Sequence, residues 1–381
     1  MAAFQILPVA DRRTRRAFLK APGRVMKGDP NYIAPFVFDA AHRLDPKAHP
    51  FFEHGEAGFW VALDASGAPV GRISAQINRS HQALHGARDG HFGSLAGIDD
   101  PALFDGLLGT AEGWLRAKGA DCAIGPASLS VNEEFGLLVE GFDTPPMLLM
   151  GHDPPWAGRF LEAAGYEKAQ DLVAYAYDPG AGPPARLAAF AAKFNEIPGA
   201  RLRTFDKSRF DEDLAAILKV FNDAWSENWG YVPMSEAEIS AMAKAFRQIA
   251  DYGLIFLAEI DGAPVGMAVS LPNVNEALAG LDGAGGPLAI ARFVWRLKIS
   301  GVKSARVLLM GVAKAAQADL AVGAAVSMAL VNALVEAHKA KGYRRLELSW
   351  ILDDNWPMRR IAEAGGAEVY KTYRLYRKDL K

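Results

Sequence analysis

The pentapeptide GAPVG occurs twice, at Gly67–Gly71 and again at Gly262–Gly266, at an offset of 195 positions. Each copy follows an apolar run, FWVAL at Phe59–Leu63 and IFLAE at Ile255–Glu259. An apolar run, a turn that contains proline and a second apolar run are typical of a β-hairpin. The sequence therefore predicts the same hairpin at two places in the chain.

Two further matches occur in the same order along the chain. AKG at Ala117–Gly119 returns at Ala340–Gly342, and each copy ends a helical pattern with glycine at the position of a C-cap. EAAGYE at Glu162–Glu167 is matched by EAGGAE at Glu363–Glu368, and both lead into a tyrosine-rich strand pattern. These matches predict a duplicated α/β unit, although sequences rich in alanine and glycine also produce short matches by chance.

The spacing of the matches divides the chain. The offset falls from 223 to 201 between the second match and the third, which places about 22 extra residues in the first half, at Glu133–Pro155. This insertion is expected either to cover a cleft between the halves or to brace them. Five of the seven residues of Asp178–Pro184 are glycine or proline, which is typical of a linker. We therefore predict units at residues 1–178 and 186–381, joined by a linker at 179–185.

Composition excludes several classes of protein. The 42 Lys and Arg residues nearly balance the 44 Asp and Glu residues, so nucleic acid is not an expected partner. The single cysteine, Cys122, excludes an internal disulfide, and His81 and His85 alone do not predict a metal site. The most apolar stretch, Leu320–Val335, is too short to span a bilayer and is expected to be a buried helix. We expect a cytoplasmic monomer or homodimer without a membrane partner.

The second half resembles the fold of GCN5-related N-acetyltransferases (GNAT) in the order of its elements. Val307–Val312 corresponds to the central strand, residues 313–322 to a loop, Ala324–Lys339 to a helix and Arg345–Trp350 to a strand that splays away. The chain as a whole, including Ser349–Asn355, also resembles a bacterial family related to GNAT proteins. The resemblance implies an α/β fold of two tandem GNAT-like units, with mixed central sheets flanked by helices.

The resemblance also implies that the second unit binds acetyl-CoA or another acyl-CoA. Backbone amides would hold the pyrophosphate, and the gap between the splayed strands would hold the pantetheine. The implied contacts are at Met310, Gly311, Val312, Val322, Gly323, Ala324, Ala325 and Asn355.

The cofactor loop departs from the pattern of the family. Leu320 stands where the family has Gln or Arg, and Asp319 opposes the charge of Lys314, so the loop is either functional or decayed. In the first half, Asp99 and Asp100 occupy the equivalent place and would repel a pyrophosphate.

Acyl transfer to an amine needs a stabilised oxyanion and a general base. The resemblance implies an oxyanion contact from a backbone N–H near Gly311 or Val312. The candidate bases are Glu259 and Glu347, although the sequence favours a solvated residue of a strand at each position. Pro357–Glu363 contains no tyrosine that could serve as the acid known in the family.

Aromatic and amide side chains are dense between Asn222 and Tyr231. Trp225, Asn228, Trp229 and Tyr231 are expected to line an acceptor site or, alternatively, to pack the two units together. The predicted function is therefore transfer of an acyl group from acyl-CoA to the amine of a small molecule or peptide. The alternative is a catalytically silent protein that binds a ligand in the cleft between the units, with its strand gap filled by Leu320 or Trp350.

Overall fold

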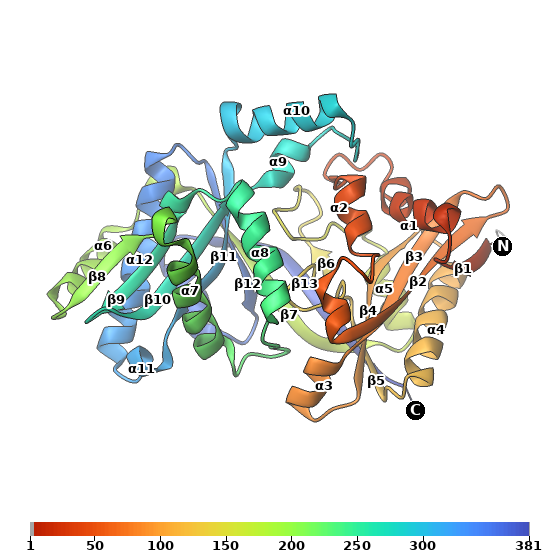
Figure 1. Ribbon diagram of the computed structural model, residues 1–381, viewed down its shortest axis with the longest axis horizontal. Helices are drawn as coiled ribbons and strands as arrows, with labels where there is room; N and C mark the ends of the chain where they lie inside the picture. Colours follow the sequence, from red (N-terminus) through yellow and green to blue (C-terminus); the bar gives the residue numbers. More distant parts are fainter. Residues whose placement is uncertain (1–3, 381) are drawn as a thin grey trace.

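The strands of the two sequence halves join in one 13-stranded mixed sheet in the computed structural model, which describes residues 4–380 (Figure 1). The strand order is β1-β2-β3-β4-β5-β13-β7-β12-β11-β10-β9-β8, and β6 pairs with β13 outside this path. Only the β4–β5 and β11–β12 pairs among the described strands are parallel.

The first half consists of β1 (Phe4–Pro8), α1 (Arg12–Val25), α2 (Val37–His42), β2 (Gly55–Asp64), β3 (Pro69–Asn78), α3 (Arg79–His85), β4 (Asp89–Gly97), α4 (Pro101–Ala117), β5 (Cys122–Gly125), β6 (Leu137–Glu140), α5 (Ala157–Ala163) and β7 (Glu167–Tyr177). The second half begins with α6 (Ala185–Ala192), β8 (Ala200–Thr204), α7 (Phe210–Trp225), α8 (Glu236–Ile249), β9 (Ile255–Ile260) and β10 (Ala263–Pro272). It continues with α9 (Val274–Leu278), α10 (Pro287–Trp295), a π-helical turn (Arg296–Ser300), β11 (Ser304–Val312), α11 (Lys314–Gln317), α12 (Leu320–Ala340), β12 (Arg345–Leu352), α13 (Trp356–Ala364) and β13 (Glu368–Asp379).

The two GAPVG sequences begin equivalent strands. β3 and β10 start within them, and each strand pairs antiparallel with the apolar strand that precedes it, β2 and β9 respectively. In both halves the second strand of the hairpin then pairs with the central strand, β4 or β11, across an irregularity in register. The predicted hairpins are therefore present, and the fold class is the predicted α/β arrangement of two GNAT-like units.

The last strands of the two halves are exchanged, which the sequence did not predict. β7 belongs to the first half but pairs with β12 of the second, from Leu346 opposite Tyr177 to Leu352 opposite Leu172. β13 belongs to the second half but pairs with β5 of the first. The division at residues 178 and 186 therefore describes segments of the chain, while the sheet runs continuously through both.

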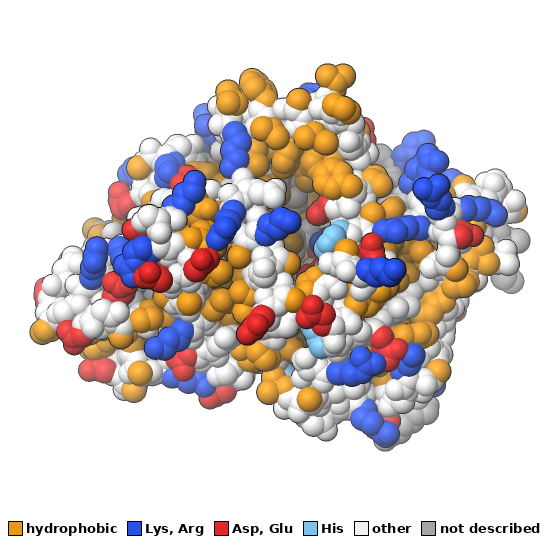
Figure 2. Space-filling model, in the orientation of Figure 1, with side chains coloured by type: hydrophobic (Ala, Val, Ile, Leu, Met, Phe, Trp, Pro, Cys, Tyr) orange, Lys and Arg blue, Asp and Glu red, His pale blue; other side chains and the backbone are white. Residues whose placement is uncertain are grey.

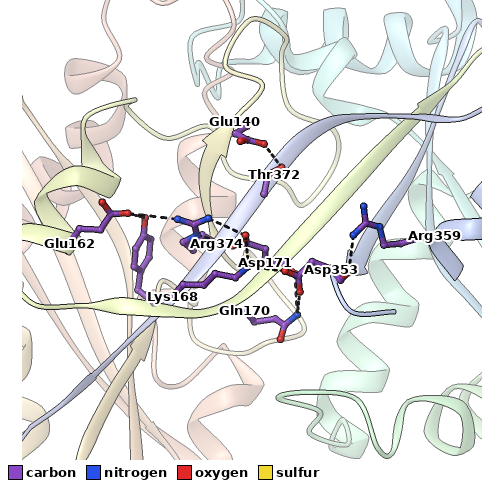
Figure 3. Close-up of polar contacts among 10 residues, drawn as sticks. Glu140, Glu162, Lys168, Gln170, Asp171, Asp353, Arg359, Thr372 and Arg374 are labelled. Carbon is purple, nitrogen blue, oxygen red and sulfur yellow. Dashed lines mark hydrogen bonds and ion pairs between the residues drawn. The ribbon is translucent and has the colours of Figure 1, made fainter. Parts of the chain in front are cut away.

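Charged side chains connect the exchanged strands (Figure 3). Arg374 of β13 donates to both carboxylate oxygens of Asp171 on β7, at 2.8 and 3.0 Å. Lys168 lies 2.8 Å from Asp171 and 2.8 Å from Asp353, which follows β12. Gln170 also donates to Asp353, at 2.6 Å. These contacts join three neighbouring strands where the halves cross.

Helices α7 and α12 cover opposite faces of β10 and β11. Residues of β10 alternate between them, because Ala268 packs in the cluster with α12 and Met267 in the cluster with α7. α12 is the one helix in residues 4–380 that is long and apolar enough to span a membrane, so the expectation that this stretch is too short is wrong. Its Val326 and Leu330 are completely buried in the core, as expected of a buried helix.

α12 begins at Leu320, four residues before the predicted start at Ala324. The reason is that Asp319 caps the helix: its carboxylate accepts hydrogen bonds from the amides of Ala321 and Val322.

Candidate functional site

A cavity of about 910 Å³ lies between the two halves. Its walls are α1, α2, the bulged part of β4 at 94–96, the segment 126–154 and the turn 274–283 of the second half. The surface in Figure 2 is hollowed in the same region, below α10 and between α8 and α2. The cavity therefore adjoins the first unit, whereas the sequence had placed the candidate site in the second.

The insertion at 133–155 both covers this cavity and braces the halves, as the two expectations proposed. Glu134, Pro146 and His152 contribute to the wall. Asn275 of the second half donates to the carbonyls of Pro146 and Met147, at 3.1 and 2.8 Å. The cavity is therefore bounded by a segment that is fixed to the opposite unit.

Asp153 supplies a carboxyl group to the cavity wall. One of its oxygens accepts a hydrogen bond of 2.9 Å from the amide of Leu138. Burial raises its pKa to about 7, and the nearby charge of Glu134 adds to this rise, while the Leu138 amide and Arg72 oppose it. A carboxyl group with this pKa can both accept and donate a proton near neutral pH.

His152 lies beside Asp153 and is paired with a second carboxylate. Its Nε2 is 3.1 Å from Oδ2 of Asp29, and the His152 side chain is almost fully buried. Burial lowers the pKa of His152, so the ring is neutral at pH 7. With the proton on Nε2 facing Asp29, Nδ1 carries a lone pair, and this atom has no hydrogen-bond partner among the described residues.

The remainder of the wall combines positive charge with apolar surface. Arg72 stacks on Phe18 with its guanidinium carbon 4.8 Å from the ring centroid, and its buried Nε has no partner among residues 4–380. Arg43 pairs with Glu134 at 2.8 Å. The apolar contributions include Phe18, Leu95, Leu148 and Leu278. Such a lining suits a ligand that has a polar head and an apolar chain.

The strand gap of the second unit is present and narrow. β11 and β12 pair only as far as Val307 opposite Leu348. Beyond this point an apolar pocket of about 30 Å³ lies between α12 and α13. Its lining includes Met310, Leu334, Leu348, Met358 and Ile361. In a catalytically silent protein, Leu320 or Trp350 was expected to fill this strand gap. Neither side chain does so: Leu320 is exposed, and Trp350 packs against Phe135 and Tyr373.

The residues predicted to hold the pyrophosphate lie in the first turns of α12. The amide of Val322 bonds to the Asp319 carboxylate at 3.2 Å, and that of Gly323 to the Asp319 carbonyl at 2.8 Å. Ala324 and Ala325 follow inside the helix. A phosphate at this helix start would therefore have to replace the Asp319 carboxylate, and the predicted role of these residues stays a prediction.

The remaining predicted cofactor residues border the gap. Met310, Gly311 and Val312 end β11, and the ring of Trp225 lies directly against Gly311. Asn355 caps α13 by accepting a hydrogen bond of 3.3 Å from the amide of Met358.

Neither predicted base lines the cavity. Glu347 is completely buried, with Arg306 3.4 Å away, and accepts hydrogen bonds from Ser349 at 2.6 Å and from Tyr370. Glu259 on β9 is paired with Arg203 at 2.7 Å. Both carboxylates thus have cationic partners, which is the arrangement of structural ion pairs.

The predicted acceptor residues contact both halves. Asn228 donates its amide to the carbonyl of Trp225 at 2.8 Å. The backbone carbonyl of Tyr231 lies 2.9 Å from Nε2 of His85 in the first half. The ring of Trp229 is centred 6.1 Å from that of Phe135, also in the first half. The segment therefore has the contacts expected of the packing alternative, and its role toward a substrate stays a prediction.

Sequence reasoning missed Asp29, Arg72, His152 and Asp153. The only local signal was HDPP at His152–Pro155, in which two titratable residues precede two prolines at the end of the insertion. Nothing in the sequence places Asp29 beside His152. Within residues 4–380, no group of three or more His, Cys, Asp or Glu side chains could hold a metal ion.

Comparisons with known proteins give relatives along the whole chain. No family model matches. The bacterial ceramide synthase of Caulobacter vibrioides is 45% identical over 380 residues, covering 100% of this chain and 98% of the relative. Protein YghO of Escherichia coli is 39% identical over 369 residues, covering 96% of this chain and 93% of the relative.

Solved structures agree on the fold. A tandem GNAT protein from the clavulanic acid biosynthesis pathway superposes with a TM-score of 0.57 at 16% identity, over 100% of this chain and 99% of that one. A GCN5-related N-acetyltransferase from Sphaerobacter thermophilus gives 0.56 at 15% identity, over 99% of this chain and 96% of that one. The predicted tandem GNAT fold is thereby confirmed.

Proposed function

Because this chain belongs to the family of the bacterial ceramide synthase of Caulobacter vibrioides and has the tandem GNAT fold, we propose that it is an N-acyltransferase that moves an acyl group from acyl-CoA to the amine of a long-chain amino alcohol. A ceramide is the amide of a fatty acid with such an amino alcohol, and 45% identity over the full length supports a related acceptor. The chemistry of the cavity agrees with this class of substrate, since it joins apolar walls to a few buried charged groups.

The observation that carries the proposal is the Asp153 carboxyl group in the cavity wall, with its pKa raised to about 7. A long-chain amine is protonated at neutral pH and must lose a proton before its nitrogen can attack. The Asp153 carboxylate accepts that proton, and its pKa matches the operating pH, as is favourable for a general base. His152 lies beside Asp153 in the same wall and is held by Asp29 at 3.1 Å.

Amide formation proceeds from the free amine and the thioester. The free amine nitrogen forms a bond to the thioester carbonyl carbon, and the tetrahedral adduct then passes its second nitrogen proton to the departing sulfur as the carbon–sulfur bond breaks. The products are the amide and the CoA thiol, which takes up one proton as it leaves. The proton on Asp153 returns to solvent. Arg72 stands at the cavity wall, where its positive charge stabilises the developing oxyanion.

Two places have the chemistry to hold parts of the acyl-CoA donor. The 910 Å³ cavity has room for the thioester end, and the exposed Lys20 and Lys27 on its rim suit phosphate groups. The 30 Å³ pocket between α12 and α13 is apolar, but Asp319 occupies the free amides at the start of α12 and Lys314 is paired with Glu227. The cavity fits the donor better, so we place the donor there.

The test is a direct assay of amide formation. The purified full chain is incubated with acyl-CoA of several lengths and a sphingoid base, and both the amide and the free CoA thiol are quantified. Asp153→Asn is expected to lower kcat by about 100-fold or more. The matched control is Asp282→Asn, which removes a charge at the exposed rim of the same cavity.

The donor site is tested in the same assay. Lys20→Glu combined with Lys27→Glu should raise KM for acyl-CoA, while Ile361→Trp, which fills the apolar pocket, should leave it unchanged. The reverse result would move the donor to the second unit. Thermal stabilisation by acyl-CoA without release of thiol from any amine would favour the silent binding protein instead. Full activity of Asp153→Asn would contradict the assignment of the base.

A further inference from the structure

Hydrophobic side chains gather on the outer face of α10, at the top of the view in Figure 2. We define the α10 patch as Phe38, Leu288, Ile290, Val294, Trp295 and Ile299, all of which are exposed. Leu288 is 88% exposed and Ile299 is 74% exposed, which is unusual for aliphatic side chains on a folded surface. Exposed apolar side chains gathered on one helix and its neighbour mark an interaction site.

The helix that carries the patch is fixed to the body of the protein by its other face. Phe293 packs edge-on against Phe36, with ring centroids 5.3 Å apart. Arg296, in the π-helical turn that follows, donates to the carbonyls of Ala277 and Ala279, at 3.1 and 2.6 Å. The exposure of the outer face is therefore a property of a docked helix, and no described element covers it.

Charge indicates what the patch binds. The segment 287–300 contains three basic residues, Arg292, Arg296 and Lys298, and no acidic residue. Arg292 and Lys298 are exposed beside Leu288, Trp295 and Ile299. An apolar stripe with tryptophan, flanked by arginine and lysine, has the composition of a helix that lies in the interface of an anionic bilayer.

The position of the patch adds a second argument. Phe38 and the neighbouring Val37 belong to α2, and the segment 282–286 that leads into α10 packs against them: the amide of Val37 donates to the Gly283 carbonyl at 3.4 Å. Val37, Asp282 and Gly283 also line the 910 Å³ cavity. The same elements thus form the rim of the cavity and adjoin the apolar surface.

We propose that the protein docks on the surface of an anionic membrane through the α10 patch, so that an amphiphilic substrate passes from the lipid directly into the cavity. The docking stands without any assigned activity, whereas the passage of substrate rests on the proposed function. The sequence analysis expects no membrane partner because its most apolar stretch is shorter than a bilayer span, but binding at the interface does not need a span.

The test is flotation of the full chain with vesicles, without any substrate. Vesicles that contain phosphatidylcholine and phosphatidylglycerol should bind the protein, and added salt should weaken the binding. Vesicles of phosphatidylcholine alone should bind it less. Leu288→Asp combined with Ile299→Asp should reduce binding by about tenfold or more, because two aliphatic side chains no longer enter the lipid.

The control is Leu84→Asp on α3, which changes another exposed leucine, 52% accessible, at the opposite end of the view in Figure 1. It should bind vesicles as the unaltered protein does. Thermal unfolding of each variant verifies that the fold is intact. An unaltered protein that stays free of both kinds of vesicle would overturn the proposal, as would a double variant that binds normally.

Two further measurements separate the possible outcomes. If the unaltered protein is a dimer and the double variant a monomer in gel filtration, and no vesicle binding is found, a second copy of the chain covers the patch and the proposal is wrong.

Amide formation is measured separately with a short-chain amine in solution and with a long-chain amine in vesicles. If the double variant loses amide formation only with the long-chain amine in vesicles, docking is supported. If the unaltered protein forms an amide with neither amine, the proposed function alone is contradicted.

Discussion

Arg306 and Glu347 face each other one pair before the end of the β11–β12 pairing in the second unit, with Nε of the guanidinium 3.4 Å from the carboxylate. Both side chains are almost completely buried, and Ser349 bonds to each of them. Glu347→Gln should lower the free energy of unfolding by about 3–5 kcal/mol, because it leaves the Arg306 charge buried without a partner. Urea unfolding measures this change.

The same variant distinguishes a structural Glu347 from a catalytic one. Replacing both residues, as Arg306→Met with Glu347→Leu, should recover much of the lost stability. The kcat of the fraction of Glu347→Gln that remains folded should equal that of the unaltered enzyme. A loss of kcat by two or more orders of magnitude in a fully folded variant would instead make Glu347 the base.

Asp153 is expected to reduce stability at neutral pH. Its folded pKa of about 7 lies above the usual value of 3.8, so the folded state favours the protonated carboxyl group. The stabilisation that protonated Asp153 gives the folded state is fully present below about pH 4. It is lost as the pH rises to 7, because the unfolded chain ionises first and the free energy of unfolding falls. Asp153→Asn should therefore increase stability at pH 7.5 by about 1–4 kcal/mol while it lowers activity. Denaturant unfolding at pH 5 and at pH 7.5 should show that the gain is larger at the higher pH; a gain equal at both would contradict the assigned pKa.

Two buried histidines should act in the opposite direction. Burial lowers the pKa of His91 to about 3 and that of His338 to about 4, and His338 also bonds to Ser270 at 2.9 Å. Their contribution to stability is present above about pH 6.5 and is lost as the pH falls toward the folded values, by about 2 kcal/mol for each histidine at pH 5. His91→Phe should reduce the difference in unfolding free energy between pH 7 and pH 5 by about that amount. The exposed His42→Gln is the control, and an unchanged difference in His91→Phe would refute the prediction.

Gly311 is expected to tolerate no side chain. A Cβ atom there would meet the ring of Trp225, so Gly311→Val should push the ring from the mouth of the strand gap and destabilise the protein by about 1–3 kcal/mol. The fluorescence of the displaced tryptophan and the thermal midpoint report the change. Gly109→Ala on α4 is the matched control: nothing lies within 4 Å of its Cβ, and alanine in a helix should add about 0.5–1 kcal/mol. Equal midpoints for the two variants would show that Trp225 does not require the glycine.

The sequence predicted the parts of the fold that local patterns determine. The hairpins at the two GAPVG sequences, and the helices that end at Ala117 and Ala340, follow from turn residues and periodicity within a few positions. The exchange of β7 and β13 could not be predicted in this way, because an apolar strand pattern specifies a buried strand and not its neighbours. The pairing of Leu346 with Tyr177 joins positions 169 residues apart.

The candidate site was less predictable for a related reason. Glu347 was singled out because it alternates with two leucines, yet alternation does not show that Arg306 neutralises it. Asp153 gains its raised pKa from burial beside Glu134, and both conditions arise only when the insertion is folded. His152 likewise acquires its partner Asp29 from 123 positions earlier in the chain.

The position of β13 has a consequence for how the two half-sheets assemble. β13 (Glu368–Asp379) follows the other described strands in sequence, yet it is inserted between β5 and β7 in the middle of the finished sheet. Until β13 folds into this place, the facing edges of β5 and β7 lack a partner strand, and neither half completes its sheet. Deleting Glu368–Asp379 would therefore leave two unjoined half-sheets, each with an exposed strand edge that favours aggregation.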